Sequence, residues 1–507
     1  MSAQKYYPTE QKFLELSKGG NLIPIYKEIL GDLETPVSAY FKIAHRAKYS
    51  FLLESVEGEE KVARYSFLAK NPELILRSKN HTLELIHCQN NRYQKETQKI
   101  TDTPLMFIRN IISQYKFVNL PQLPRFCGGL VGYIGYDVVR FFEKLPQTTR
   151  DDLKLPDIFL ILASNLIIFD HRNHSIKVVS CVSIDPNSSS QAKRIAYKKG
   201  VRQIDQMIDE LQKPNIKKSK PKLKNPKSIK LNVKSNFTED KFTHIVEEAK
   251  KKIQAGDIIQ VVLSQRFQVK LKTDPFHIYR ALRSINPSPY MYYLKFDQVH
   301  IVGSSPELLV RCEEGVVETR PIAGTRPRGQ NDQVDLTLIK DLLNDPKEKA
   351  EHIMLVDLGR NDLGRVCREG SVQVSEFMGI EKYSHVMHIV SNIKGQLRPD
   401  KDALDVLQAA FPAGTVSGAP KIRAMEIIEE LEEVSRGPYA GCIGYFSFSG
   451  NLDTCITIRT VVVTKDRAYV QTGAGIVADS VPRKEYLETI NKAKAQIRAI
   501  ELAHTLE

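Results

Sequence analysis

The sequence has no apolar run long enough to span a bilayer. Its N-terminus, Met-Ser-Ala-Gln-Lys-Tyr-Tyr-Pro, has neither the apolar core of a signal peptide nor the Arg- and Ser-rich character of a transit peptide. These absences argue against a membrane-spanning helix and against export, so we expect no membrane association. We expect a cytoplasmic protein, or one of the plastid stroma if the chain is plastid-encoded and needs no transit peptide.

Cysteine motifs are also missing. The seven cysteines include no Cys-x-x-Cys pair, so the sequence predicts neither a zinc ribbon nor a disulfide framework. A Gly-x-Cys-x-Gly elbow, which could carry the nucleophile of a glutaminase, is absent as well. The nearest match, Ala440-Gly-Cys442-Ile-Gly444, lacks the first glycine.

Acidic residues are absent from 211–236, where nine lysines lie and account for nine of the thirteen net positive charges of the chain. The strip is rich in Lys, Pro and Asn and has no periodicity, which is typical of a linker rather than a binding face. We therefore expect no nucleic-acid partner. The alternative from another class is a basic polyanion-binding protein with an inactive enzyme fold, and salt-insensitive behaviour on nucleic acid would exclude it.

The 507 residues are enough for two to four ordinary domains or for one large two-part fold. The linker at 211–236 separates an N-terminal part, 1–210, from a second part, 237–507. Strands and helices alternate without a regular β-α-β rhythm, which predicts an α+β fold of mostly antiparallel sheets packed together with helices outside. In the first part we expect strands at 38–41, 49–54 and 158–170, and helices at 105–115, at 191–211 and over part of 14–29.

Two helices are predicted to carry paired carboxylates. Residues 344–365 read as a helix capped by Asp345 with Pro346 at its first position, and 482–502 read as the last helix. Each places two Glu side chains three residues apart, hence on one face; these are Glu348 with Glu351 and Glu485 with Glu488. Together the helices could hold Mg²⁺, which prefers a few carboxylates plus water and substrate oxygens. The alternative is two solvated helix surfaces.

The second part also contains polar, glycine-rich segments between apolar strands. They lie at 303–307, 320–329, 383–388, 411–421, 437–441, 457–459 and 471–475. Singly, Arg459 could be a surface ion-pair partner and His388 a core histidine, and Gly-Ala-Gly at 473–475 is too short for a dinucleotide fingerprint. Together they supply amides, an Arg, an imidazole and carboxylates, which suits a small anionic substrate held partly through a metal.

Four long strings give the chain a family resemblance. Pro-Ile-Ala-Gly-Thr-Arg-Pro-Arg-Gly, Glu-His-Ile-Met-Leu-Val-Asp-Leu-Gly-Arg-Asn-Asp, Phe-Pro-Ala-Gly-Thr-Val-Ser-Gly-Ala-Pro-Lys and Gln-Thr-Gly-Ala-Gly-Ile-Val-Ala-Asp-Ser resemble the chorismate-utilising enzymes. Among these the chain is most similar to the large subunits of anthranilate synthase, from about residue 20 to 505 apart from the Lys-rich linker. The family makes anthranilate and pyruvate from chorismate and ammonia, the first committed step of L-tryptophan biosynthesis.

The resemblance implies roles for individual residues. Mg²⁺ would be held by Glu351 and Glu488, supported by Glu348 and Glu485. Catalysis would use Glu307 as the general acid for the C4 hydroxyl and His388 in the later loss of pyruvate. Chorismate would contact Gly324, Thr325, Tyr439, Arg459, Gly473, Ala474 and Gly475, the last three through their backbone.

Two positions bear on which relative the chain resembles. Aminodeoxychorismate synthases commonly carry a nucleophilic Lys where this chain has Ala323, and enzymes that add water carry an activating Lys where it has Gln260. The resemblance therefore favours ammonia as the nucleophile. Aminodeoxychorismate synthase is the alternative enzyme, and the identity of the product distinguishes the two.

The resemblance also implies a partner and an inhibitor. Because the elbow motif is missing, ammonia would come from a separate glutamine amidotransferase subunit, in a heterotetramer of two large and two small subunits. Residues 52–55 and 286–291 are similar to the two sides of a feedback site for L-tryptophan, with Leu52 and Met291 as apolar walls and Ser55 at the amino-acid end. The expected site residues are Ser55, Pro289, Tyr290 and Met291. The alternative is that both segments are ordinary strands and turns.

Overall fold

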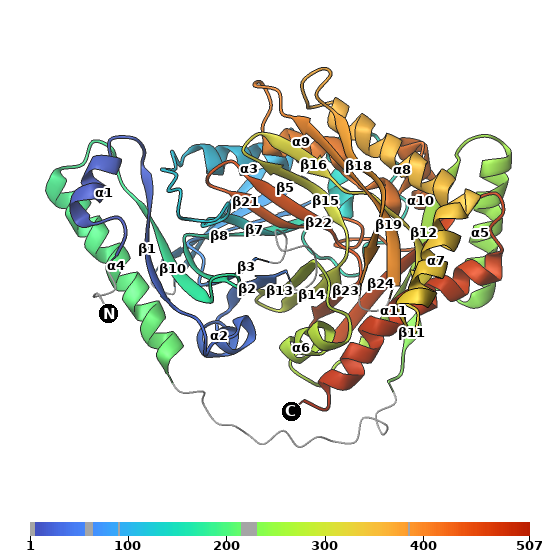
Figure 1. Ribbon diagram of the computed structural model, residues 1–507, viewed down its shortest axis with the longest axis horizontal. Coiled ribbons are helices and arrows are strands. Elements are labelled where there is room, and N and C mark those ends of the chain that lie inside the picture. The colour runs from blue at the N-terminus through green and yellow to red at the C-terminus, as the bar shows by residue number, and fades with distance from the viewer. Residues whose placement is uncertain (1–5, 56–63, 90–91, 214–230, 384–385, 507) are drawn as a thin grey trace.

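A computed structural model describes residues 6–55, 64–89, 92–213, 231–383 and 386–506. Its architecture is two large antiparallel sheets with helices at the two ends and on the outer faces (Figure 1). The fold class expected from the sequence is therefore confirmed. No helix of the described ranges is both long and apolar enough to cross a membrane.

Sheet A has twelve strands. In spatial order they are β1 (Leu22–Leu30), β10 (Ser175–Ser183), β9 (Asn165–Asp170), β3 (Tyr65–Lys70), β2 (Tyr49–Glu54), β13 (Tyr290–Phe296), β14 (Val299–Ser305), β23 (Thr460–Thr464), β24 (Arg467–Ile476), β12 (Gln260–Lys270) and β11 (Lys234–Ser235), with β20 (Gly418–Ala419) also paired to β12.

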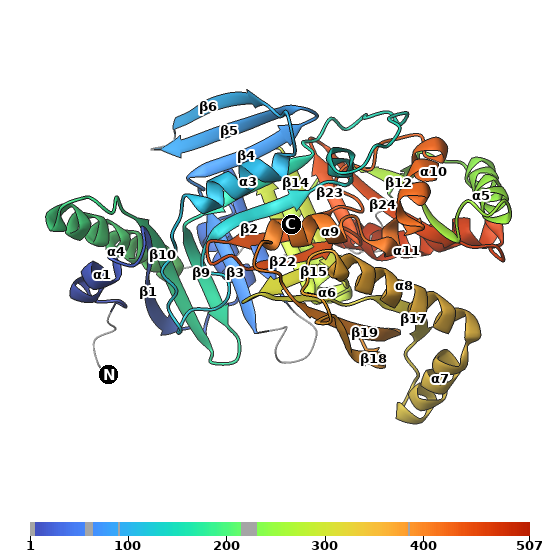
Figure 2. The ribbon, with the colours of Figure 1, turned by 90° about the horizontal axis from the view of Figure 1, so that it is seen from above.

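Sheet B also has twelve strands. In order they are β17 (Ile322–Pro327), β19 (Val386–Gln396), β16 (Val316–Thr319), β15 (Leu308–Glu313), β22 (Leu452–Ile456), β21 (Cys442–Ser447), β7 (Gly129–Ile134), β8 (Ile158–Ala163), β4 (Leu74–Lys79), β5 (Thr82–Gln89) and β6 (Arg92–Lys99), with β18 (Gln373–Lys382) paired to β19. Figure 2 shows β4, β5 and β6 at the outer edge of this sheet.

The helices lie at the ends and outer faces. They are α1 (Glu10–Leu16), α2 (Pro36–Ile43), α3 (Pro104–Ser113), α4 (Ser190–Gln212), α5 (Glu239–Gln254), α6 (Pro275–Ile285), α7 (Asp332–Asn344), α8 (Pro346–Gly364), α9 (Ala403–Ala410), α10 (Lys421–Leu431) and α11 (Pro482–Ala503), with 3-10 turns η1 (Tyr136–Phe141) and η3 (Gly414–Val416). The helices α8 and α11 match the two that the sequence predicts, and Asp345 caps α8 through the backbone N–H groups of Lys347 and Glu348.

One predicted element is wrong. Residues 38–41 lie in α2 rather than in a strand, because Thr35 and Ser38 form a capping box and Pro36 occupies the first turn. The helix expected over part of 14–29 is present only at its start, because α1 ends at Leu16 and the strand β1, which begins at Leu22, pairs along its length with β10. Tertiary pairing thus overrides the local pattern in this segment.

Both sheets contain strands from before and after the Lys-rich segment. In sheet A the strands β2 and β13 pair directly, and in sheet B β7 pairs with β21. The sheets pack face to face, with the ring of Phe159 in β8 stacked on Phe296 in β13 at 4.3 Å. Of the predicted linker, residues 214–230 lie outside the described residues.

Candidate active site

A cavity of about 620 Å³ opens where the β12–β24 end of sheet A meets the β17–β19 end of sheet B. Its size is in the range of small-molecule sites. Segments from across the second half of the chain line it, and the sequence-predicted residues among them are Glu307, Gly324, Thr325, Glu348, Glu351, His388, Tyr439, Arg459, Gly473, Gly475, Glu485 and Glu488. The structure thus brings together nearly all the residues that the sequence singled out for substrate, metal and catalysis.

Glu307 lies in the wall of the cavity between β14 and β15, where it is 8% exposed. Burial raises the pKa of its carboxyl to about 8, and the neighbouring Thr415 hydroxyl and Lys492 ammonium offset this only in part. At neutral pH the group is therefore mostly protonated. A neutral carboxyl facing a cavity can donate a proton.

His388 in β19 is held in one tautomer by residues of the neighbouring strand β17. Its Nδ1 lies 2.8 Å from the Gly324 carbonyl oxygen and 3.1 Å from the Thr325 hydroxyl. A carbonyl only accepts, so Nδ1 carries the proton and Nε2 has a free lone pair. Burial, together with the charge of Arg459, lowers the pKa of the imidazole and keeps it neutral. The ring is thus set up to accept a proton at Nε2.

Gly324 makes the bend that places this carbonyl. It adopts φ +67, a left-handed conformation that a side chain would strain. A Cβ there would also lie 3.1 Å from the Glu348 carboxylate. Glycine therefore lets β17 approach both the histidine and the carboxylates of α8.

The four carboxylates come from the first turns of α8 and α11. Burial and the charge of Glu351 raise the pKa of Glu348, and burial and the charge of Glu488 raise that of Glu485. Carboxylates crowded in this way favour a nearby cation. Glu348 is partly paired with Arg326 at 3.3 Å, and Glu488 with Lys492 at 2.6 Å.

This donor set fits Mg²⁺ but not a cage made by the protein alone. Among the described residues no three His, Cys, Asp or Glu side chains are close enough to hold a metal by themselves. Mg²⁺ usually takes one or two carboxylates and completes its octahedron with water and substrate oxygens. The carboxylates of two helices facing one cavity are suited to that arrangement.

The remaining wall of the cavity can receive a carboxylate. Arg459 in the segment before β23 is largely buried, which lowers the pKa of its guanidinium. Tyr439 lies next to Gly473, where a Cβ would come within 2.7 Å of the tyrosine oxygen. Gly475 is similarly close to the Gln260 side chain. The two glycines open the strand backbone to a ligand beside a positive charge.

Ala474 differs from its neighbours. Because side chains alternate along β24, its methyl group points away from the cavity into the core beneath α5 and α10. Only its backbone can contribute to the site.

A buried ion pair supports this wall from behind. The Arg436 guanidinium contacts the Glu432 carboxylate at 2.6 Å and donates to the carbonyl oxygens of Val416 and Val262, each at 2.7 Å. Val262 and Val416 line the cavity, and the guanidinium also lies 5.5 Å from the Tyr439 ring. One arginine thus ties together three segments of the wall.

Comparison with known proteins agrees with this geometry. A family model described as chorismate binding enzyme matches residues 54–498. Anthranilate synthase component 1 of Acetivibrio thermocellus is 50% identical over 501 residues, which cover 98% of this chain and 99% of that protein. The corresponding protein of Aquifex aeolicus is 49% identical over 496 residues, covering 96% and 97%.

The chain belongs to the chorismate-binding enzymes. Within that family it groups with anthranilate synthase component I. The crystal structure of that component from Streptococcus pneumoniae superposes with a TM-score of 0.75 at 39% identity, covering 92% of this chain and 98% of that one. The menaquinone-specific isochorismate synthase of Escherichia coli shares the fold, with a TM-score of 0.67 at 19% identity.

The two positions that the sequence analysis used to choose between relatives, Gln260 and Ala323, both face the cavity. Gln260 reaches toward Glu351, with 3.5 Å between the amide nitrogen and the carboxylate oxygen, and Ala323 lies beside Gly324. Neither side chain has a basic nitrogen. In the cavity, therefore, no amine occupies either position.

Sequence reasoning missed several residues of the cavity, of which two lie near Glu307 or Glu488. Lys492 donates to the Gly473 carbonyl at 3.1 Å as well as pairing with Glu488. Its position four residues after Glu488 on α11 was a signal that could have identified it. Thr415 lies beside Glu307 and belongs to a segment that the sequence singled out, but without a role.

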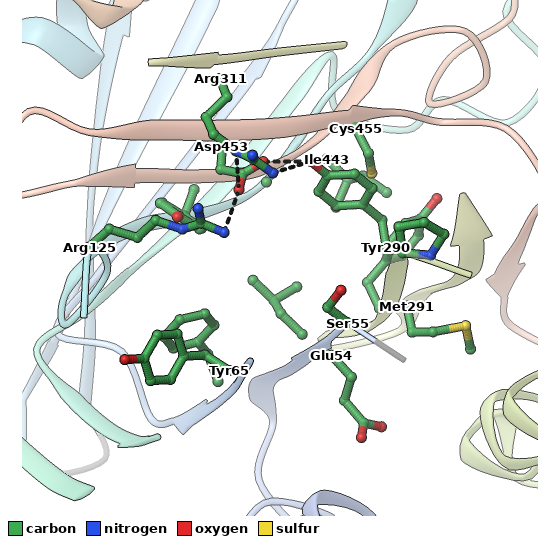
Figure 3. Close-up of a pocket in the computed structure, with 16 residues that line it drawn as sticks. Glu54, Ser55, Tyr65, Arg125, Tyr290, Met291, Arg311, Ile443, Asp453 and Cys455 are labelled. Carbon is green, nitrogen blue, oxygen red and sulfur yellow. Dashed lines mark hydrogen bonds and ion pairs between the residues drawn. The ribbon is translucent and has the colours of Figure 1, made fainter. Parts of the chain in front are cut away.

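A second pocket lies where the two sheets meet near the start of β13 (Figure 3). Ser55, Pro289, Tyr290 and Met291, the residues predicted for the inhibitor, all line it. The Ser55 hydroxyl is buried and has no hydrogen-bond partner among the described residues. Such a group is available to a ligand.

Charged side chains form one wall of this pocket. Asp453 accepts from Tyr290 at 2.9 Å and from Arg311 at 3.1 Å, and Arg125 lies 3.3 Å away (Figure 3). Because opposite charges meet in a buried setting, most of this wall is paired internally, but the buried Arg125 Nε has no hydrogen-bond partner among the described residues.

The apolar walls differ from the prediction. Leu52 and Met291 have their side chains in the core on the other face of sheet A, and only the backbone of Met291 borders the pocket. Leu53 lines the pocket instead of Leu52. Strand alternation explains both changes, since a shift of one residue moves a side chain to the opposite face.

Proposed function

We propose that this chain is the chorismate-using component of an anthranilate synthase, converting chorismate and ammonia into anthranilate, pyruvate and water. The observation that carries the proposal is the buried, protonated Glu307 in a cavity that also holds an arginine, a neutral histidine and two carboxylate pairs. Each ionic group of chorismate has a counterpart there. The family membership supports the same reading.

Two carboxylates of chorismate would be bound at opposite ends of the cavity. The enolpyruvyl carboxylate would lie against Arg459, Tyr439 and the open backbone of Gly473–Gly475. The ring carboxylate would lie toward Glu351 and Glu488, with the carboxylates of Glu348 and Glu485 behind them. Mg²⁺ bound there would supply the positive charge that offsets the repulsion between these carboxylates and the substrate.

Proton transfer would then begin at Glu307. Its carboxyl proton would pass to the C4 hydroxyl, which leaves as water while ammonia adds at C2. Loss of the C2 proton and elimination of pyruvate would make the ring aromatic. His388, neutral and with its Nε2 lone pair free, would accept a proton in that later stage.

Gln260 and Ala323 favour ammonia over the competing nucleophiles. An amide cannot act as the general base that activates water, and a methyl group cannot attack C2. Aminodeoxychorismate synthase is therefore the less favoured alternative. The product of an aminodeoxychorismate synthase would keep the enolpyruvyl group.

The supply of ammonia and the control of the reaction are part of the same proposal. A separate glutamine amidotransferase subunit would provide ammonia, in a heterotetramer of two large and two small subunits, because no nucleophile elbow is present in this sequence. L-tryptophan would inhibit by binding the second pocket, with Ser55 at its amino-acid end. We place the enzyme in the cytoplasm, with the plastid stroma as the alternative for a plastid-encoded chain.

Anthranilate fluorescence tests the proposal. Purified chain, chorismate, Mg²⁺ and ammonium should give a rising signal that L-tryptophan suppresses. Omission of Mg²⁺ should abolish it. Consumption of chorismate without anthranilate would refute the argument from Gln260 and Ala323.

A further inference from the structure

A small cavity of about 40 Å³ lies on the far side of Glu307 from the main cavity. Glu307, Leu355 and Thr415 border both spaces, so these three residues form the boundary between the two. A water needs roughly 10–15 Å³ of such volume, which leaves room for about three waters. The general acid therefore has a second, water-sized space at its back.

The small cavity extends along α8 to Asp362. Leu355 marks its inner end and Asp362, seven residues later, its outer end. At 1.5 Å per residue these positions are about 10 Å apart along the helix axis. Three waters at hydrogen-bonding distances of about 2.8 Å span a gap of that length.

Polar groups stand at both ends of this space. At the inner end the Thr415 hydroxyl is buried and makes no hydrogen bond of ordinary length within the described residues. At the outer end the Asp362 carboxylate is 11% exposed and lies 2.9 Å from the Lys421 ammonium. An unpartnered hydroxyl beside a water-sized space is where an ordered water is expected.

Asp362 is connected to solvent through its partner. Lys421, with Arg365, lines a surface depression of about 240 Å³ bordered by α9 and the start of α10. Burial raises the pKa of Asp362, and the positive charges of Lys421 and Arg365 oppose this shift. The carboxyl thus sits between the water-sized cavity and the surface and can take up a proton more readily than an exposed aspartate.

We propose that Asp362 and the small cavity form the route by which Glu307 regains its proton in each turnover. The inference rests on the proposed function, in which Glu307 donates that proton. When chorismate fills the main cavity it covers the front of Glu307, whereas the space behind remains open.

The steps of this relay balance. Glu307 gives its proton to the C4 hydroxyl, the C4–O bond breaks, and its electron pair leaves with the water formed. The Glu307 carboxylate then takes a proton from a water in the small cavity. The Asp362 carboxylate takes up a proton from solvent beside Lys421 and passes it inward along the waters, which restores the water that gave up its proton and leaves Asp362 ionised again. Asp362 acts through water and touches no reacting atom, so it is a positioning and relay residue.

Two variants test the relay from its two sides. Asp362→Ala removes the outer carboxyl, and Ala413→Val fills the small cavity with apolar volume while leaving both carboxyls in place. We expect kcat for anthranilate formation to fall on the order of tenfold in each, less than the roughly 10²–10⁴-fold loss expected for the acid itself, with little change in the KM for chorismate. Asp357→Asn, which changes an exposed carboxylate on the same helix, is the control and should keep its kcat.

Rescue by imidazole, whose protonated form is a small weak acid, distinguishes a relay role of Asp362 from a structural role. It should restore kcat in Asp362→Ala as its concentration rises, because it can enter the space left by the side chain and deliver a proton. It should not restore Ala413→Val, whose cavity is filled. A bulky buffer of similar pKa should rescue neither.

Undiminished kcat in either folded variant would overturn the relay. So would a loss in Asp362→Ala that imidazole fails to reverse. The activity of the wild-type chain distinguishes failure of the relay from failure of the proposed function. If the wild type forms no anthranilate from chorismate, ammonium and Mg²⁺, the proposed function is wrong. If the wild type is active, the variants decide whether the relay operates.

Discussion

At the scale of single residues, Glu307 shows how burial controls chemistry. It lies next to Lys492 and Thr415, which both favour its charged form, and burial still raises its pKa to about 8. The same desolvation lowers the pKa of His388, which is held through Nδ1 by the Gly324 carbonyl. One residue is thus kept as an acid and the other as a base at the same pH.

Replacing Glu307 by Gln removes the acid while keeping its shape. We expect kcat to fall about 10²–10⁴-fold, the range for a positioned proton donor. Because only the protonated carboxyl is active, kcat/KM of the wild type should fall as pH rises through about 8, and the variant should lose that limb of the profile. Anthranilate fluorescence across pH measures both.

A wild-type rate that keeps rising well above this pH would contradict the assignment of Glu307. The control is Glu369→Gln, a change at an exposed position, which should behave as wild type.

The neighbouring residues Glu432 and Glu433 give a matched test of stability. Glu432 pairs with Arg436 where both side chains are nearly inaccessible, at 3% and 2% exposure, whereas Glu433 pairs with Lys241 on the surface. Glu432→Gln leaves a buried arginine without its counter-charge and should cost about 3–5 kcal/mol. Glu433→Gln should cost under about 1 kcal/mol. Urea unfolding followed by circular dichroism compares them, and equal shifts of the midpoint would show that burial does not govern this pair.

At the scale of elements, the cavity depends on where two helices begin. The N-cap at Asp345 and the prolines at 346 and 482 place the starts of α8 and α11, and the carboxylates follow within the first two turns. Helix starts carry partial positive charge, which helps to accommodate these anions before a metal arrives. Burial, together with the repulsion that remains, raises the pKa of Glu348 and of Glu485.

Magnesium should therefore stabilise the folded chain even without substrate. With Mg²⁺ at 100 times its dissociation constant we expect about 2.7 kcal/mol of stabilisation, seen as a higher thermal midpoint than in EDTA. The double variant Glu351→Gln, Glu488→Gln should show no difference between the two conditions. Asp357→Asn, an exposed change on α8, should retain the full difference. If the double variant is still stabilised by Mg²⁺, other residues bind the ion.

At the scale of the whole molecule, the two sheets connect the second pocket to Glu307. Tyr290, which lines that pocket, lies directly opposite Ser305 in the β13–β14 pair, two residues before Glu307. On the sheet B side, Cys455 lines the pocket, and the N–H of Ile456 donates to the Glu307 carbonyl at 3.0 Å. A ligand that shifts these strands would move Glu307, the proposed general acid, which would give inhibition a physical path.

Binding of L-tryptophan can be followed directly, because the chain has no Trp of its own. The anisotropy of the ligand's indole fluorescence should rise on adding protein. Ser55→Ala removes the buried hydroxyl and should weaken binding by about 1.5–3 kcal/mol, the usual value of a hydrogen bond to a charged group. Binding that Ser55→Ala leaves unchanged would exclude this pocket or this orientation of the ligand.

Local signals in the sequence were enough for some of these elements. Caps and spacing act within a few residues, so α8, α11 and the facing of their carboxylates followed from the chain alone. Residues 38–41 show the limit, because a capping box there outweighed the apparent strand pattern.

The sequence by itself therefore determined the family, the fold class and many of the polar residues of the main cavity. Only the tertiary structure decided the burial that turns Glu307 into an acid, the direction of Ala474, Leu52 and Met291, and the water-sized space between Glu307 and Asp362. The physical reason is the distance along the chain over which each effect acts. Desolvation and the face that a strand buries depend on segments far apart in the chain, and they exist only once the two sheets have packed.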